Sequence, residues 1–466
     1  MSFNFKFINM NKVVLFLSIL LMGIYSCTGD NSPKSLFNGE NTDQWETQGN
    51  VAVENGIITV NNGAALVLKK GNYSDFILKV KARTVGNGKG FIAFHTDNAA
   101  DGYRVALNND LESAEWWTKT GSLLSVRNLA KSTVKTDEWF DMDIQVEGKA
   151  ITISVNGNPV VEYIEPTAPY RTAEHSSKLL SSGKFAIQSS EGTIEIESIE
   201  VTPLKTNPDI AQQQLLAIDE TTDHIIKLHQ DNFPVLDYHV HLKGITADEA
   251  AKQSRKYGIN YALAPNCGIG FPITNDEEVI EYIKEMEGQP FIQAMQGEGR
   301  EWPQTFSAEV REKFDYVFTD ALTFTDTKGR RTRLWIPEEV YIENEQEYMD
   351  LIVQKIVDVM QEPMDVYVNP NFLPDVMNDR YDEFWTEERM DKVIKALVET
   401  DKVLEINNRY EIPNKAFILK AKEAGLKFTF GTNNGDGDFG KLEYCIRMKE
   451  ECGITAEDMY KPNMTI

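Results

Sequence analysis

Two histidines in the second half of the chain have the spacing of paired ligands. His239 and His241 lie in the run Asp237-Tyr238-His239-Val240-His241, which has the composition of a buried β-strand. Residues two apart on a strand point to the same face, so both imidazoles can meet one ligand. Imidazole nitrogens bind divalent metal ions and also carry protons or form hydrogen bonds. The pair therefore predicts either a metal site or a polar pocket in which the histidines only hydrogen-bond.

Polar side chains also end most of the other strand-like runs in this half. Glu298 ends the third run with Arg300 just behind it, and Asp320 lies in the fourth. The later runs end in the amides and carboxylate of Asn369, Glu405, Asn407 and Asn433. Glu298 or Asp320 could act as a base or join the histidines on a metal, and the other groups suit a sugar or an anion. Alternatively, Arg300 pairs with a neighbouring acid and Asn433 only forms a turn.

The elements that must position these residues alternate between strand and helix. Seven strand-like runs are found: Val235–His241, Asn260–Pro265, Phe291–Glu298, Tyr316–Thr323, Val366–Asn371, Val403–Asn407 and Lys427–Thr432. Helical patterns separate most of them, and one, Thr246–Tyr257, starts with a capping box of Thr246 and Glu249. This alternation predicts a distorted (βα)7 barrel over residues 233–466, with the polar strand ends gathered at one face.

Residues 36–204 follow a different pattern of short runs in which apolar and polar residues alternate. Phe76–Ala82 and Thr193–Val201 are examples, and turn signals such as Asn61-Asn62-Gly63 and Asn156-Gly157 separate such runs. Many short strands without a helical period predict an antiparallel β-sandwich. Residues 205–232 are expected to form a helical linker, so the chain is predicted to be multidomain.

The sandwich has candidate site residues of its own. His95 and Asp110 are its candidate catalytic side chains, and Arg104 could bind a polar ligand. Trp116 and Trp117 could stack on a sugar ring. Neighbours on a strand face opposite sides, so we expect one of these two indoles in the core.

The first 26 residues have the features of an export signal. Lys6 and Lys12 precede an apolar core, Val13 to Met22, that is too short to span a bilayer comfortably. Ile24-Tyr25-Ser26-Cys27 resembles the lipobox of bacterial lipoproteins, which implies cleavage before Cys27, a lipid on its thiol and a tether over residues 27–35. An ordinary signal with a chance cysteine is the alternative. We therefore expect a membrane-anchored protein of the cell envelope, with the outer membrane favoured because Thr28 and not Asp follows the cysteine.

Charge and cysteine content exclude other classes. The chain has 47 Lys and Arg against 72 Asp and Glu residues, a formal net charge of -25. Such a surface repels phosphate backbones, so nucleic acid is not an expected partner. The three cysteines beyond Cys27 have no zinc-like spacing, and we expect a fold that does not depend on disulfides.

The barrel pattern resembles the polymerase-and-histidinol-phosphatase (PHP) superfamily. His239-Val240-His241 on a first strand, a carboxylate ending the third and seven strand–helix units carry the resemblance, which implies a metal-dependent hydrolase. Four positions depart from the family pattern: Asn266-Cys267, Asp320, Asn369 and Asn433-Asn434-Gly435 stand where other ligands, mostly histidines, are expected. The resemblance therefore implies one divalent metal ion, with the ligands His239, His241, Glu298 and Asp320, and not a multinuclear site.

The sandwich resembles the 3-keto-disaccharide hydrolase family, a concanavalin-like jelly roll. The matching segments are Leu36–Trp45, Gly90–His95, Gly102–Leu107, Thr120–Leu123 and Ser182–Ser189. The family implies glycosides with a ketone at carbon 3, which acidifies the hydrogen on carbon 2. A base can then remove it, the glycosidic oxygen leaves by elimination, and water adds back. Tyr103-Arg104-Val105-Ala106 departs from the family's usual Tyr-Glu-x-Gln, and Ser189-Ser190 from its usual Gln-His.

Two functions follow. The first is a carbohydrate-active hydrolase or lyase that acts on 3-keto-glycosides or related fragments with the help of a metal. In the second, the sandwich is a non-catalytic glycan-binding module attached to a metal-dependent hydrolase-like barrel whose substrate the sequence does not identify.

Overall fold

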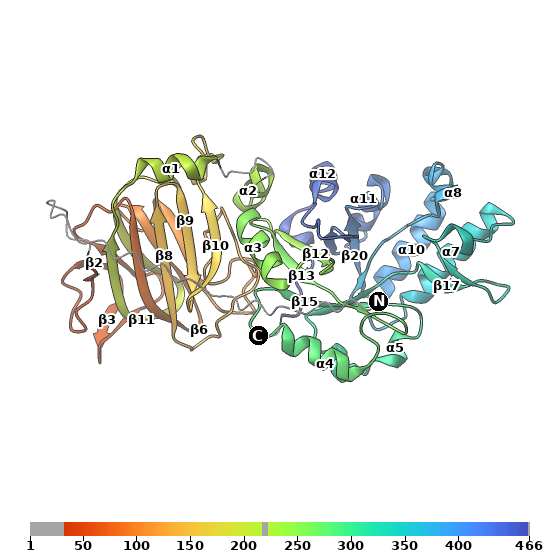
Figure 1. The fold of residues 1–466 in the computed structure, drawn as a ribbon, viewed down its shortest axis with the longest axis horizontal. Coiled ribbons are helices and arrows are strands. Elements are labelled where there is room, and N and C mark those ends of the chain that lie inside the picture. The colour runs from red at the N-terminus through yellow and green to blue at the C-terminus, as the bar shows by residue number, and fades with distance from the viewer. Residues whose placement is uncertain (1–31, 217–221, 465–466) are drawn as a thin grey trace, which may run out of the picture.

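The computed structural model describes residues 32–216 and 222–464, which form two β-sheets of different kinds (Figure 1). The N-terminal sheet is antiparallel and the C-terminal sheet is parallel. The expected export signal and Cys27 lie outside the described residues, so the lipid anchor stays a prediction. No helix in the described ranges is long and apolar enough to cross a membrane.

The N-terminal domain is built on two long strands, β6 (Phe76–Thr96) and β11 (Lys184–Pro203), that pair along most of their length. The other strands are β1 (Lys34–Ser35), β2 (Trp45–Gln48), β3 (Val51–Glu54), β4 (Ile57–Val60), β5 (Ala65–Leu68), β7 (Tyr103–Asn108), β8 (Phe140–Glu147), β9 (Ala150–Val155) and β10 (Asn158–Ile164). The sheet order is β10-β9-β8-β6-β11-β4-β3, with β7 on β6, β1 and β5 on β11, and β2 on β5.

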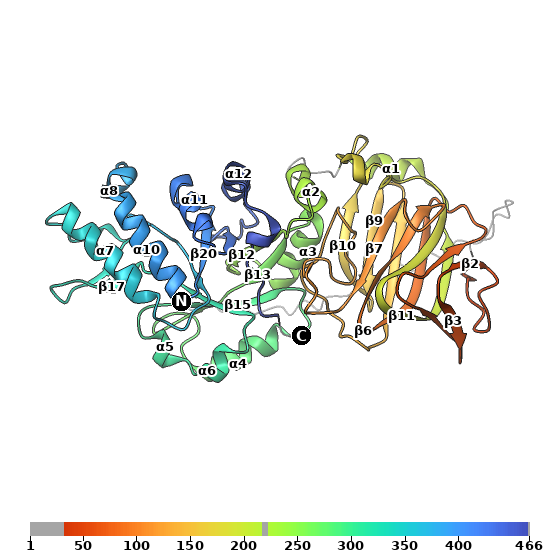
Figure 2. The same ribbon diagram turned by 180° about the vertical axis from the view of Figure 1, so that it is seen from behind.

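The long strands change partners part-way along, which gives the domain a jelly-roll-like form (Figures 1 and 2). Residues 76–82 of β6 pair with β8, and residues 89–94 pair with β7. The register of β6 against β11 shifts between the two halves. Alternation buries Phe76, Leu78 and Val80 in the core while Lys79 on the same strand faces solvent. The prediction of an antiparallel, sheet-rich domain is confirmed.

The C-terminal region is a nearly closed barrel of parallel strands in the order β12-β13-β15-β16-β19-β20-β21. The strands are β12 (Leu236–Val240), β13 (Asn260–Leu263), β15 (Ile292–Gly297), β16 (Tyr316–Thr319), β19 (Val366–Tyr367), β20 (Val403–Asn407) and β21 (Phe428–Gly431), with a short β14 (Asn266–Cys267) beside β15. Asn433 N donates to His239 O (2.9 Å), which brings the last strand beside the first. Each of the seven predicted runs contains one of these strands.

The connections between barrel strands are irregular. The helices are α3 (Ala247–Tyr257), α4 (Asp276–Glu285), α5 (Trp302–Thr305), α6 (Ala308–Arg311), α7 (Glu345–Val359), α8 (Asp375–Asn378), α9 (Tyr381–Phe384), α10 (Glu387–Glu399), α11 (Lys415–Glu423) and α12 (Glu443–Cys452). A hairpin of β17 (Thr323–Thr325) and β18 (Arg331–Arg333) precedes α7, and three helices follow β19. The described barrel therefore has seven strands but not seven equivalent strand–helix units. The predicted capping box of Thr246 and Glu249 is present at α3.

The fifth predicted strand is shorter than expected because of its backbone angles. The run Val366–Asn371 contributes only Val366–Tyr367, because Asn369 and Asn371 adopt left-handed backbone angles (φ 49° and 63°). Asparagine tolerates this region better than most residues, but it ends the strand. Cys267, Cys445 and Cys452 are free and buried, which agrees with a fold that does not depend on disulfides.

The two domains pack directly on each other, beside the helices α1 (Pro208–Leu215) and α2 (Thr222–Gln230), which fall in the predicted linker. The Asn260 side chain, at the start of β13, accepts from Ala130 N (2.9 Å) and donates to Asn128 O (3.0 Å) and Val235 O (2.8 Å). His229 Nε2 donates to Gly258 O (2.8 Å), and His229 Nδ1 accepts from Asn128 N (3.4 Å). Buried polar groups thus join sandwich, linker and barrel.

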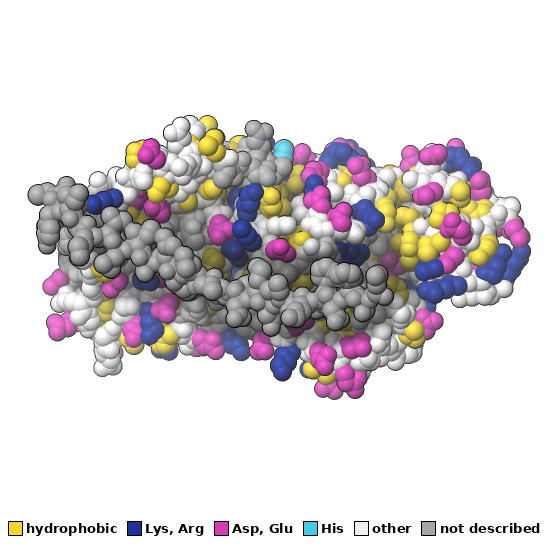
Figure 3. Space-filling model, in the orientation of Figure 1, with side chains coloured by type: hydrophobic (Ala, Val, Ile, Leu, Met, Phe, Trp, Pro, Cys, Tyr) yellow, Lys and Arg dark blue, Asp and Glu magenta, His cyan; other side chains and the backbone are white. Residues whose placement is uncertain are grey.

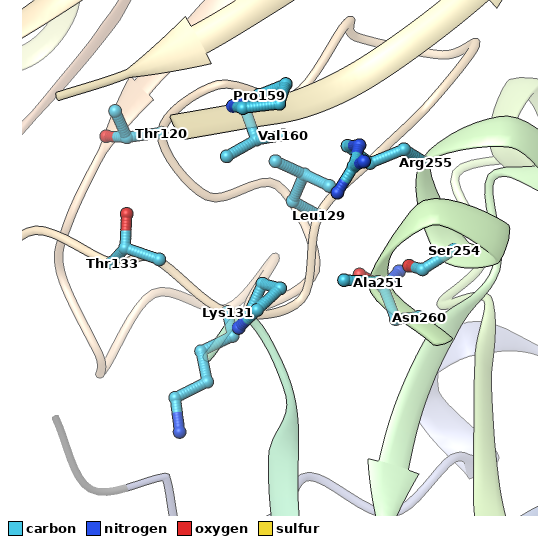
Figure 4. Close-up of a pocket in the computed structure, with 11 residues that line it drawn as sticks. Thr120, Leu129, Lys131, Thr133, Pro159, Val160, Ala251, Ser254, Arg255 and Asn260 are labelled. Carbon is cyan, nitrogen blue, oxygen red and sulfur yellow. The ribbon is translucent and has the colours of Figure 1, made fainter. Parts of the chain in front are cut away.

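The crevice at this contact is too small to be a ligand site. Figure 4 shows Leu129 and Lys131 from the sandwich facing Ala251, Ser254 and Arg255 of α3. The space available to a water-sized sphere is about 20 Å³, which is room for about one water molecule. The contact is therefore structural.

We expect Asn260→Ala to lower the free energy of unfolding by about 2 kcal/mol, because it leaves Ala130 N and Asn128 O without their partner in a buried place. Val235 O also loses the side-chain amide but keeps its bond from the backbone N of residue 260 (3.1 Å). Urea unfolding followed by circular dichroism measures this loss. The exposed Asn87→Ala is the matched control, expected within about 0.5 kcal/mol of wild type. Equal stabilities of the two variants would contradict the role given to Asn260.

Candidate functional site

The predicted polar residues do gather at one end of the barrel, linked by side-chain hydrogen bonds. His239 is on β12, Glu405 and Asn407 are on β20, and Asn369 and Asn433 follow β19 and β21. Parallel strands place their carboxyl ends at one face, which explains why residues distant in sequence meet here. We call this set, together with Glu298, Asp320 and His241, the barrel-mouth cluster.

A buried histidine–carboxylate pair lies at the centre of the cluster. His239 Nδ1 is 2.6 Å from Glu405 Oε1, and both side chains are fully buried. Because a carboxylate only accepts, Nδ1 carries the hydrogen and Nε2 keeps its lone pair. Nε2 is buried and has no hydrogen-bond partner among the described residues. A nitrogen prepared in this way can accept a proton or bind a metal.

Asparagine side chains hold the other oxygen of Glu405. Oε2 accepts from Asn369 N (2.7 Å) and from Asn407 Nδ2 (2.9 Å). Asn369 Oδ1 in turn accepts from Asn407 Nδ2 (3.0 Å) and Asn433 Nδ2 (2.6 Å), and Asn369 Nδ2 donates to Asp320 Oδ2 (3.0 Å). The predicted substrate-binding residues Asn369, Glu405, Asn407 and Asn433 are thus bonded mainly to one another. In this structure they position His239 and Asp320.

Two acidic side chains, Glu298 and Asp320, lie near His239. Burial, and after it the charge of Asp320, raise the pKa of Glu298 to about 8, although the hydrogen bond from Asn266 Nδ2 (2.6 Å) acts in the opposite direction. Burial also raises the pKa of Asp320. Two carboxyls in a shared buried place cannot both ionise easily, so Glu298 keeps its proton near neutral pH. The cluster therefore contains a base, the unprotonated Nε2 of His239, and an acid, the protonated carboxyl of Glu298.

Arg300 supports the acidic pair from outside. Its guanidinium donates to Asp320 O (2.7 Å), to Thr319 Oγ1 (3.1 Å) and to Glu362 Oε1 (3.1 Å). Arg300 therefore pairs with an acid, which is the alternative that we considered. The partner is Glu362, which is not a neighbour in the sequence.

His241 is held as a neutral imidazole. Its Nδ1 lies 2.7 Å from Ala264 O and so donates to it, while Asn434 Oδ1 accepts from the His241 backbone N (2.8 Å). Burial, and after it the neighbouring His239, lower the pKa of His241 to about 3. The two rings are 5.1 Å apart and nearly perpendicular.

A metal ion fits this arrangement only in part. The free Nε2 of His239 suits a metal, but no group of three or more His, Cys, Asp or Glu side chains in residues 32–216 and 222–464 is arranged to hold one. The four predicted ligands His239, His241, Glu298 and Asp320 therefore do not converge as a set. We derive no chemical step through a metal, and metal binding stays a prediction.

The candidate residues of the sandwich are occupied by structural contacts. His95 uses both ring nitrogens on the backbone, with Ser74 O (2.9 Å) and Ser181 N (3.2 Å). Arg104 stacks on the Phe91 ring (4.8 Å). Asp110 Oδ2 lies 3.7 Å from Lys89 Nζ, and Oδ1 accepts from Glu112 N (3.0 Å). His95 has no ring nitrogen left for proton transfer.

Both tryptophans are in the core, where we expected one, because they lie in the segment between β7 and β8 and not on a strand with alternating faces. Trp116 and Trp117 are 3% and 6% exposed and pack edge to face at 5.6 Å. They belong to the hydrophobic core of the barrel, and Trp117 Nε1 donates to Asn232 Oδ1 (3.1 Å). They serve the contact between domains and present no open face to a sugar.

One residue of the site was missed by the sequence analysis. A Cβ on Gly431 would lie 2.3 Å from Glu405 Oε1 and 2.8 Å from the His239 Cβ, so only glycine lets the pair meet across β21. The signal was present, since Gly431 is the glycine near the end of the last strand-like run.

Comparison with known proteins supports the N-terminal assignment. The model of the family described as the 3-keto-alpha-glucoside-1,2-lyase-like domain matches residues 32–202. Among solved structures, the chain is similar to a candidate glycosyl hydrolase from Parabacteroides distasonis (17% identity, TM-score 0.34, 38% of this chain and 95% of that chain). It is also similar to the carbohydrate-binding module CBM66 from Bacillus subtilis (15% identity, TM-score 0.27, 34% and 94%). No match is found among curated proteins. By the match to the family model, residues 32–202 are a 3-keto-disaccharide hydrolase-like domain.

We expect the Glu298 carboxyl to titrate near pH 8, and to titrate at lower pH in Asp320→Asn, because the variant removes the neighbouring negative charge. Carboxyl ¹³C NMR measures both titrations. Asp350→Asn, an exposed carboxylate on α7, is the control and should leave the titration unchanged. If the Glu298 carboxyl titrates near its ordinary value in the wild type, Glu298 cannot be the group that holds a proton at neutral pH.

Proposed function

We propose that the protein cleaves oxidised glycosides, 3-keto-glycosides or related glycan fragments, by proton transfer at the barrel-mouth cluster. One observation carries the proposal: His239 has a buried, unpartnered Nε2 while Glu405 holds its Nδ1. The family match of residues 32–202 supports the substrate class, since that family is described by its action on 3-keto-glucosides.

The residues suit an elimination followed by hydration. His239 Nε2 takes the proton from carbon 2, next to the ketone, and the Glu405 carboxylate stabilises the imidazolium. Protonated Glu298 gives its proton to the glycosidic oxygen, so the bond from carbon 1 to that oxygen breaks and a double bond forms between carbons 1 and 2. Water then adds at carbon 1 and gives one proton to Glu298, while His239 returns its proton to carbon 2. Both groups regain their starting states.

The ketone oxygen must be stabilised while it carries negative charge. Lys243 and Arg409 supply positive charge near His241, where each lowers the pKa of that histidine. Donors and charges fixed in a water-poor site stabilise such an oxygen more strongly than the same groups do in water.

A second role is proposed for the sandwich, as a glycan-binding module. The observation that favours it is the engagement of the predicted residues His95, Arg104 and Asp110 in structural contacts, which leaves neither His95 nor Asp110 free to act as a base. With a lipid on Cys27, the protein would meet glycan fragments at the cell envelope, at the outer membrane.

On a 3-keto-glucoside, we expect His239→Ala to lower kcat by about 1,000-fold and Glu405→Gln by about 100-fold, since the first removes the base and the second its orienting charge. Reducing-sugar release measures turnover. His224→Ala, an exposed histidine on α2, is the control and should retain full activity. No turnover of any 3-keto-glucoside by the wild type would overturn the proposal.

Chelation separates the two forms of the mechanism. The acid–base route predicts that EDTA leaves at least about half of the activity, because no step in it requires a metal. Activity that disappears with EDTA and returns with one divalent cation, together with that cation in elemental analysis, would show a metal-assisted reaction. Loss of the cation in His239→Ala would then place it at the barrel mouth.

A further inference from the structure

An apolar groove opens on the end of the barrel that lies away from the sandwich. It has a volume of about 220 Å³ and is lined by Leu334, Trp335, Pro337, Val340, Ile342, Pro374, Asp375 and Val376. Trp335 is 40% exposed and Val376 is 66% exposed. Figure 3 shows apolar side chains at the surface on this end of the molecule, where α8 and the β17–β18 hairpin lie. Exposed apolar surface that forms a concave groove marks a binding site more often than scattered residues do.

Both walls of the groove are connected to the carboxylate of Asp320 through hydrogen bonds and short chain segments. Oδ1 accepts from Leu322 N (3.0 Å), and Leu322 O accepts from Leu334 N (3.0 Å), the first residue of one wall. Oδ2 accepts from Asn369 Nδ2 (3.0 Å), and the other wall starts at Pro374, five residues further along. Leu334 therefore lies within about 12 Å of Asp320, given the reach of two residues and one strand pairing. A sugar at the cluster can thus place its substituent toward the groove.

We propose that this groove is the subsite for the leaving group, and that it selects glycosides with a flat, uncharged aromatic aglycone of one or two rings. This rests on the proposed function, which supplies the sugar subsite. The volume exceeds the about 150 Å³ of a cavity that holds benzene, so one or two rings fit. The lining offers one indole face and two prolines for stacking, and Asp375 is its one charged residue. An anionic or sugar leaving group would find few partners there.

The test compares two substrates that share the sugar: 2-naphthyl and methyl 3-keto-glucoside. We expect Val376→Asp and Trp335→Ala each to raise KM for the naphthyl substrate about tenfold, and to leave KM for the methyl substrate and kcat within about twofold. Ile280→Asp, an equally apolar and half-exposed position on α4, is the control and should change neither KM. Equal effects on both substrates, or none, would overturn the subsite.

Direct binding keeps this test separate from the proposed reaction. Calorimetric titration with 2-naphthol should show binding to the wild type and to Ile280→Asp, and binding about tenfold weaker to Val376→Asp. If the wild type turns over neither substrate but binds 2-naphthol in this pattern, the proposed reaction is rejected and the groove is retained as a binding site for aromatic groups. No 2-naphthol binding, or dimers in the wild type that Val376→Asp converts to monomers in sedimentation, would show that the groove does not serve an aglycone.

Discussion

The hydrogen bond between His239 and Glu405 is the constraint around which the barrel mouth is arranged. A buried carboxylate is stable only when its oxygens are satisfied, and here the imidazole occupies one oxygen while a backbone N–H and an asparagine amide occupy the other. The asparagines must then satisfy their own remaining groups, which they do on one another and on Asp320. The absence of a side chain at Gly431 is part of the same arrangement, because any Cβ there would separate the pair.

This network also explains why the two carboxyl groups near it differ in character. Glu405 is surrounded by donors, whereas Glu298 receives one amide hydrogen bond and sits beside another carboxyl. The same residue type therefore has opposite tasks in one site: Glu405 stays as an acceptor that orients a ring, and Glu298 retains a proton. Environment assigns these tasks, since nothing in the local sequence of either residue distinguishes them.

Much of the fold could be predicted from the sequence, because it depends on local periodicity. Alternation marked the antiparallel domain, and all seven barrel strands fell within the predicted runs. Strand ends were less predictable, since the left-handed angles of Asn369 and Asn371 depend on bonds made elsewhere. For the site, the sequence predicted which end of the barrel holds it but not which of its residues contact one another. That His239 and Glu405 pair, 166 positions apart, depends on how the barrel closes, and so does the burial of both tryptophans at the domain contact.

The position of Trp116 and Trp117 bears on how the two domains can be combined. These residues belong to the sandwich in sequence but to the core of the barrel in space. A domain that completes its core with a neighbour's side chains is not an exchangeable part: a barrel without the sandwich would lack two buried indoles and would expose the apolar surface that they cover. The sandwich, by contrast, has a large hydrophobic core of its own. The dependence between the two domains is therefore mainly that of the barrel on the sandwich.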